Sequence, residues 1–248
     1  MSGVVTILRR ELAGLFFSPL AWVLLFAALA LNGAMFVLYV GLTEGAVDDS
    51  ISNALGSAWP FWSMIVVLPP LLTMKMISEE SRAGVLEFLL TAPVSDWAVV
   101  TGKLLAATAF MAILWSSTLG YGLALAWLGA APDWPVLLGS YLGAVLVSAL
   151  FCAIGLVASA GTGTPLLAAF LAFVVNVVVL MLPFLAKLAG AAPDNWRGAF
   201  SRRIDVIARV QGSFGLGVID TSHVLFFVVW TAFCVFLATR LVESRRWR

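Results

Sequence analysis

Long apolar runs alternate with short polar segments along this chain. A membrane-spanning helix needs about 20 mostly apolar residues, and six runs reach that length. We expect these spans near Leu20–Leu42, Trp59–Ile77, Gly102–Leu128, Val136–Ala160, Pro165–Leu188 and Val224–Leu241. The pattern therefore predicts an all-α, polytopic integral membrane protein with six transmembrane helices.

Two of these spans have unusual features. The second contains Pro69-Pro70, which would kink the helix or mark a re-entrant bend, because proline cannot donate a backbone hydrogen bond. The third is expected to begin in water and to enter the bilayer a turn or two later.

Amphipathic segments flank the spans at both surfaces. At the N-terminus an apolar stripe lies on one helical face, and Arg9 and Arg10 lie on the other, which favours an interfacial helix on the inner leaflet. Glu11 interrupts its apolar face, and Pro19 ends the segment. A second apolar stripe predicts a surface helix on the far leaflet. The two stripes are Val4, Leu8, Leu12 and Leu15, and Trp196, Phe200, Ile204 and Ile207.

The distribution of Lys and Arg predicts the orientation of the spans, since cytoplasmic loops are enriched in both. The polar segments 43–58 and 129–135 contain neither residue, whereas the segments on the other side contain several. The longer third outer segment, 189–222, departs from this rule with four arginines. We therefore expect both termini in the cytoplasm of a bacterial cell, with the protein in the cell inner membrane.

Composition supports a membrane protein and argues against other classes. Hydrophobic residues make up 62% of the 248 residues and charged residues 11%, whereas soluble domains contain about 25% charged residues. The net charge of +1 gives no basic field that would attract nucleic acid. Cys152 and Cys234 lie in apolar runs without metal-ligand spacing, so we expect small core residues, with no metal and no cofactor bound by this chain.

The segment from Lys75 to Lys103 is the one strongly charged stretch in an otherwise apolar chain. Ser78 can cap a short helix with a broad apolar side, from whose opposite side Glu80 and Glu87 project. Pro93 ends that helix, and Ser95 with Asp96 in the next turn favours the start of another. The pattern predicts a short helix, a tight corner and a second helix. A solvated connecting loop is the alternative.

This segment resembles the signature between the second and third spans of ABC-2 type transporter permeases, closest to the gliding-motility branch that includes nitrous-oxide-reductase maturation permeases. The resemblance rests on Glu79-Glu80, on Gly84-Val85-Leu86-Glu87, on Leu89-Leu90, on Pro93-Val94-Ser95 and on Gly102-Lys103. Val85 stands where Thr is commoner in that family. The sequences GLGVIDTSHVLFF from Gly215 and LVESRRWR at the C-terminus add support.

The resemblance implies a permease subunit that works with a separate cytoplasmic ATP-binding cassette ATPase dimer. It further implies a second permease copy or a related permease subunit as partner, in contact with membrane lipids. Segment 78–91 would be the coupling helix that docks into the ATPase. The coupling residues that the resemblance implies are Glu79, Glu80, Arg82, Gly84, Glu87 and Pro93.

The chain would form a single ABC-2 type transmembrane domain over 1–248. Its parts are an interfacial helix (1–19), spans one and two (20–77), a cytoplasmic coupling segment (78–101), spans three to five (102–188), an outer-face segment (189–223), and span six with a cytoplasmic tail (224–248). The chain contains no G-x-x-x-x-G-K-[ST] phosphate loop, so it is not expected to hydrolyse ATP itself or to have catalytic residues. The expected activity is movement, in the export direction, of a lipid-like or amphipathic substrate.

Other function classes fit the residues less well. An ion-coupled carrier needs ionisable groups at membrane depth, and the interiors of the six spans have almost none. An intramembrane protease needs a Ser–His pair, paired Asp residues or an HExxH site, and His223 is the only histidine. A non-transporting membrane scaffold or assembly factor of a gliding-type or secretion machinery remains the alternative function.

A few polar and small residues near or within the spans have specific expected roles. Asn32 and Asn176 could line a translocation route or form hydrogen bonds between helices. Asp220 is expected to cap the last span. The spacing of Gly139 and Gly143, which is repeated at Gly155 and Ser159, permits close helix packing, within the chain or between two copies.

Overall fold

The computed structural model describes residues 2–42, 59–82, 95–129, 131–188 and 196–245. Six stretches within them are long and apolar enough to cross a membrane. These are Pro19–Leu42, Trp59–Arg82, Asp96–Trp127, Trp134–Gly161, Pro165–Leu188 and Thr221–Ser244. The described residues form helices without strands. The expected all-α, six-span membrane protein is therefore confirmed.

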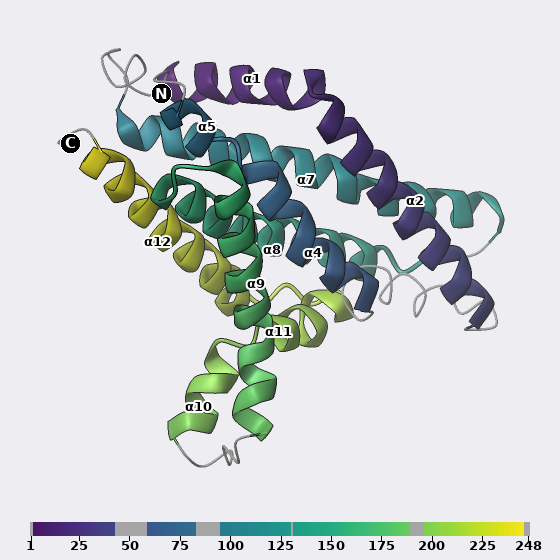
Figure 1. The fold of residues 1–248 in the computed structure, drawn as a ribbon. Helices are drawn as coiled ribbons and strands as arrows, with labels where there is room; N and C mark the ends of the chain where they lie inside the picture. The colour runs from purple at the N-terminus through teal and green to yellow at the C-terminus, as the bar shows by residue number, and fades with distance from the viewer. Residues whose placement is uncertain (1, 43–58, 83–94, 130, 189–195, 246–248) are drawn as a thin grey trace.

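The described helices follow the chain in a simple order (Figure 1). The first half contains α1 (Ser2–Phe17), α2 (Pro19–Leu42), α4 (Trp59–Thr73), α5 (Ser78–Arg82) and α7 (Asp96–Trp127). The second half contains α8 (Trp134–Gly161), α9 (Pro165–Leu188), α10 (Trp196–Arg203), α11 (Val206–Gly212), the 3-10 turn η2 (Phe214–Leu216) and α12 (Thr221–Arg245).

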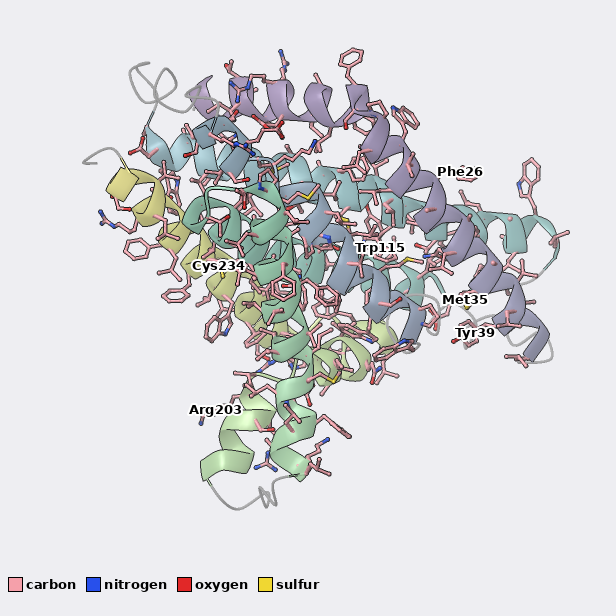
Figure 2. The ribbon with its side chains drawn as sticks, viewed as in Figure 1. Phe26, Met35, Tyr39, Trp115, Arg203 and Cys234 are labelled. Carbon is pink, nitrogen blue, oxygen red and sulfur yellow. The ribbon has the colours of Figure 1, made fainter. Side chains whose placement is uncertain are left out.

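The two ends of the helical bundle differ in what covers them. Figure 1 shows α1 lying across one end, where α5, the start of α7 and the end of α12 also lie. At the opposite end α10 extends away from the bundle, and Figure 2 shows Arg203 there. The two described ends of the chain, Ser2 and Arg245, therefore lie at the same end of the bundle, as an even number of spans requires.

Helix α8 lies at the centre of the fold and packs against α4, α7, α9 and α12. Trp115 of α7 is fully buried beside it and donates a hydrogen bond of 2.9 Å from Nε1 to Ser148 Oγ. The ring of Phe61 on α4 lies 4.9 Å from that of Trp115. Only a minority of the residues of α2, α9 and α12 are buried, and Phe26 on α2 illustrates an outward side chain (Figure 2).

The proline pair does not fold the second span back on itself. Helix α4 continues through Pro69 and Pro70 to Thr73, so the re-entrant alternative is wrong. Pro70 has no N–H, which leaves the carbonyl of Val66 without its usual partner one turn later. Asn176 Nδ2 of α9 donates a long hydrogen bond of 3.5 Å to that carbonyl oxygen. A side chain from a neighbouring helix thus replaces the missing backbone donor.

The small residues of α8 make room for other parts of the same chain. A Cβ atom at Gly139 would lie 2.7 Å from Phe214 O, and one at Gly143 would lie 2.9 Å from Phe214 Cβ. A Cβ atom at Gly155 would lie 2.1 Å from Thr73 Oγ1. In the described residues these glycines therefore serve packing within the chain.

The segment beyond α9 forms two short helices instead of one. Helix α10 ends at Arg203, and α11 begins at Val206 after Asp205, whose Oδ1 accepts a hydrogen bond of 2.9 Å from Ala208 N. The predicted continuous surface helix is therefore wrong, because Asp205 caps a new helix in the middle of the apolar stripe.

Candidate functional site

Helix α5 is the described part of the predicted coupling segment. Of the residues expected to contact an ATPase, it contains Glu79, Glu80 and Arg82. Gly84, Glu87 and Pro93 lie outside the described residues. The following helix, α7, begins as predicted, because Ser95 Oγ accepts a hydrogen bond of 3.3 Å from Ala98 N and Asp96 lies in the first turn.

A cluster of four charged side chains joins α5 to α1 and α7. Lys103 Nζ lies 2.8 Å from Glu80 Oε2 and 2.9 Å from Glu11 Oε1. Arg10 forms ion pairs with the same two carboxylates. We call Arg10, Glu11, Glu80 and Lys103 the ion-pair cluster. Its two cations and two anions come from three helices that are distant in the sequence.

Burial makes the loss of Lys103 or of either carboxylate in this cluster costly. The Lys103 side chain is fully buried, and the side chains of Glu11 and Glu80 are 14% and 18% exposed. A buried ion pair adds little net stability, but removal of one partner leaves a buried charge uncompensated and costs about 3–5 kcal/mol. The cluster therefore couples the positions of α1, α5 and α7.

Gly102 explains how α1 comes close enough to α7 for this contact. A Cβ atom at Gly102 would lie 2.8 Å from Ile7 Cγ2 and 3.2 Å from Val4 O. Ile7 is the most buried described residue of α1. The pair Gly102-Lys103 thus combines a close helix approach with a charge that Glu11 and Glu80 neutralise.

The cluster also affects the ionisation of Arg10, which lies outside the spans. Burial alone would lower the pKa of the Arg10 guanidinium. Hydrogen bonds and charge interactions with Glu11 and Glu80 outweigh that effect and raise this pKa above its usual value. Arg10 therefore stays charged at neutral pH.

Sequence reasoning missed the role of Glu11. The pattern treats Glu11 as an interruption of an apolar face, but this residue provides the acid that Lys103 needs. The sequence contained a signal for this contact. Glu11 is an acidic residue on an otherwise apolar and basic helix, and Lys103 lies near the start of a span.

Two expected orientations on α5 are wrong. Glu80 was expected to project from the exposed side, but its carboxylate lies in the ion-pair cluster. The helical pattern of segment 78–91 also places Arg82 towards the apolar side of the helix, but Arg82 is exposed. Glu79 is exposed as well, with its carboxylate 3.9 Å from Lys75 Nζ. The described charged groups of α5 that are available at the surface are therefore those of Glu79 and Arg82.

The start of α5 is held by α8 instead of by a cap of its own. Ser159 Oγ accepts hydrogen bonds of 3.2 Å from Ile77 N and 3.0 Å from Ser78 N, and it donates one of 3.1 Å to Met74 O. The Ser78 hydroxyl donates back to Met74 O. The expected cap by Ser78 is therefore wrong, and a residue from another span satisfies these amides.

The two asparagines lie within the spans and are buried. Asn176 forms the hydrogen bond to Val66 described above. Of the two expected roles, this favours a hydrogen bond between helices over a position lining a translocation route. Among the described residues, Oδ1 of Asn176 and Oδ1 of Asn32 have no hydrogen-bond partner.

At the other end of the bundle, Asp220 precedes α12. Its Oδ1 accepts a hydrogen bond of 2.8 Å from Ser222 N, which is the geometry of a helix N-cap. This hydrogen bond, together with charge interactions with His223 and Arg209, lowers the pKa of the exposed Asp220 carboxyl. Cys152 and Cys234 are buried free thiols, and no group of His, Cys, Asp and Glu side chains in the described ranges could hold a metal ion.

Comparison with known proteins identifies one family. Residues 6–245 match the model of the family described as ABC-2 family transporter protein. The match includes the ion-pair cluster, α5 and all six candidate spans. No curated protein matches the chain.

Proposed function

We propose, given that this chain belongs to the ABC-2 family of transporter proteins and is a membrane subunit of an ABC transporter, that it couples ATP hydrolysis by a separate cytoplasmic ATPase to substrate movement. The observation that carries the proposal is the buried ion pair between Glu80 and Lys103. It fixes the polar helix α5 to the start of α7, so a displacement of α5 by a docked ATPase would displace α7 as well.

The docking surface in this proposal lies on the exposed side of α5. Glu79 and Arg82 are exposed there, beside Lys75 and the start of α9 at Pro165. Charged groups at the rim of an interface mainly govern the rate and specificity of association. They would orient the ATPase while Ser159 and Lys103 hold α5 in place from the membrane side.

Several finer properties belong to the same proposal. Both termini and α5 would face the cytoplasm, the chain would pair with a second permease subunit, and the ATPase would be a dimer. The resemblance of segment 79–103 supports assignment to the gliding-motility and nitrous-oxide-reductase maturation branch. Lys103 and the other described charged side chains of the spans lie near span ends, which supports a lipid-like or amphipathic substrate. The proposed direction of its movement is export.

Affinity purification of the tagged chain from its native membrane tests the central point. We expect an ATPase with a phosphate-binding loop to co-purify in a fixed ratio, and candidate amphiphiles to stimulate its hydrolysis. Purification of the intact chain without such an ATPase, even after cross-linking in the membrane, would favour the scaffold alternative.

Cysteine labelling with an impermeant reagent tests the orientation. A cysteine introduced at Ser52 should react from outside intact cells, and one at Ser81 only after the cells are opened. The reverse pattern would place α5 on the outer side and would exclude docking of a cytoplasmic ATPase.

A further inference from the structure

A mixed cavity lies where α1 turns into α2 beside the end of α4. Its volume is about 300 Å³. The lining is both polar and apolar: it includes Glu11, Ser18, Lys75 and Glu79 as well as Leu24 and Leu72, which belong to the spans. The cavity therefore offers both a polar and an apolar environment to one molecule.

The depth of this cavity matches that of lipid head groups. The turn between α1 and α2 carries Phe17, which is 87% exposed, and Trp22, which is 55% exposed. Trp22 Nε1 donates a hydrogen bond of 2.6 Å to Phe16 O. An exposed Trp with a polar tip near the end of a span is typical of the membrane–water interface. The cavity thus lies where a span leaves the apolar part of the bilayer.

The charges around the cavity leave one exposed ion pair that a head group can reach. Glu11 and Glu80 line it, but Arg10 and Lys103 neutralise both. Lys75 and Glu79 remain, with their charged atoms 3.9 Å apart and each side chain 56% exposed. A lysine can bind a phosphate, and a carboxylate accepts hydrogen bonds from an ammonium group. This pair complements a head group with one charge of each sign.

From these observations we propose that the cavity binds the head group of a zwitterionic phospholipid that carries a primary amine, with an acyl chain along Leu24 and Leu72. The cavity is about ten times the volume of one water molecule, about 30 Å³, and lies at the lower end of small-molecule sites, about 300 Å³ and above. The proposal rests on the membrane location of the chain and not on its proposed coupling to an ATPase.

Native mass spectrometry of the purified full chain tests this proposal. The chain is titrated in detergent with phosphatidylethanolamine, phosphatidylcholine or phosphatidylglycerol of identical acyl chains. We expect one phosphatidylethanolamine to bind in preference to the others, because the quaternary ammonium of phosphatidylcholine has no N–H donor and phosphatidylglycerol has no cation. Loss of charge-assisted hydrogen bonds should weaken binding about tenfold in Lys75→Gln/Glu79→Gln.

A second variant fills the cavity without removing charge. Gly14 lines the cavity, and a Cβ atom there meets no atom within 4 Å, so Gly14→Leu should fold and exclude the lipid. Gly41→Leu is its control, since Gly41 of α2 has equally open surroundings but does not line the cavity. Arg240→Gln/Glu243→Gln is the control for the charge variant, because it removes an exposed ion pair away from the cavity.

The lipid titrations of the native chain and of the four variants distinguish support for the proposal from its rejection. Preferential binding of one phosphatidylethanolamine that is lost in Gly14→Leu and in Lys75→Gln/Glu79→Gln, and kept in both controls, supports the proposal. Equal binding of all three lipids, a preference for phosphatidylglycerol, or equal effects of the variants and their controls overturns it.

Discussion

Lys103 and Glu80 lie in different helices, yet their charged groups are 2.8 Å apart and the Lys103 side chain has no contact with solvent. Burying a cation is costly unless it is paired, and Glu11 provides the second carboxylate beside Lys103. The end of the second span, the start of the third span and the N-terminal helix therefore share one electrostatic contact.

Lys103→Met should destabilise the protein by about 3–5 kcal/mol, because it leaves the carboxylates of Glu11 and Glu80 close together with only Arg10 to compensate them. Thermal unfolding in detergent, followed by fluorescence-detected size exclusion, measures this. Lys75→Met is the matched control: the Lys75 ion pair is exposed, so its loss should cost less than about 1 kcal/mol. Equal effects of the two substitutions would show that the cluster does not stabilise the fold.

Glu79 and Glu80, which are adjacent in α5, should have different functions. Glu79→Lys should leave thermal stability unchanged and weaken ATPase association, because Glu79 is exposed. Glu80→Lys should destabilise the protein itself, because it places a third cation beside Lys103 and Arg10. Pull-down of the ATPase and thermal unfolding of the same samples distinguish the two effects. Full ATPase binding by Glu79→Lys would remove this residue from the docking surface.

Gly155→Ala should destabilise the packing of α8 against α4 by about 1–3 kcal/mol, as overpacking in a core does. The added Cβ atom would lie 2.1 Å from Thr73 Oγ1. Thr73→Ala should restore much of the loss when combined with Gly155→Ala, and a double-mutant cycle measures this coupling. Gly120→Ala is the control, because a Cβ atom there meets nothing within 4 Å. Additive effects of the two substitutions would contradict the close contact.

Asp220 should stabilise the start of α12 in a pH-dependent way. Its pKa is lowered in the folded protein by the hydrogen bond from Ser222 N, so the carboxylate stabilises the fold above the ordinary carboxyl pKa of about 4. That contribution is lost as the pH falls through the lowered pKa. Hydrogen exchange of the first turn of α12 should be faster in Asp220→Ala than in the native chain at neutral pH. The difference should vanish in acid.

The number of spans could be predicted because bilayer thickness fixes the length of an apolar run. The predicted fifth span, Pro165–Leu188, coincides with α9, since Pro165 starts the helix after a turn. The start of α7 was predictable from Ser95 for a similar local reason. In both cases the signal lies within a few residues of the element it defines.

The errors arise where distant residues decide the local structure. Nothing near Ser78 indicates that Ser159 of another span accepts hydrogen bonds from the amides at the start of α5. The helical periodicity of segment 78–91 placed Glu80 on the exposed side. A helical wheel shows one helix alone, so it cannot show that Glu80 pairs with Lys103 of α7. The role of Glu11 was hidden for the same reason.

The ion-pair cluster also imposes an order on biosynthesis. The ribosome makes Glu11 first, Glu80 after two spans, and Lys103 only at the start of the third. A nascent chain that stops before Lys103 therefore contains two acidic side chains with Arg10 as their only partner from the cluster. The N-terminal helix and the first two spans can acquire their final arrangement only when the third span enters the membrane, so premature termination within segment 83–102 leaves an intermediate without its central cation.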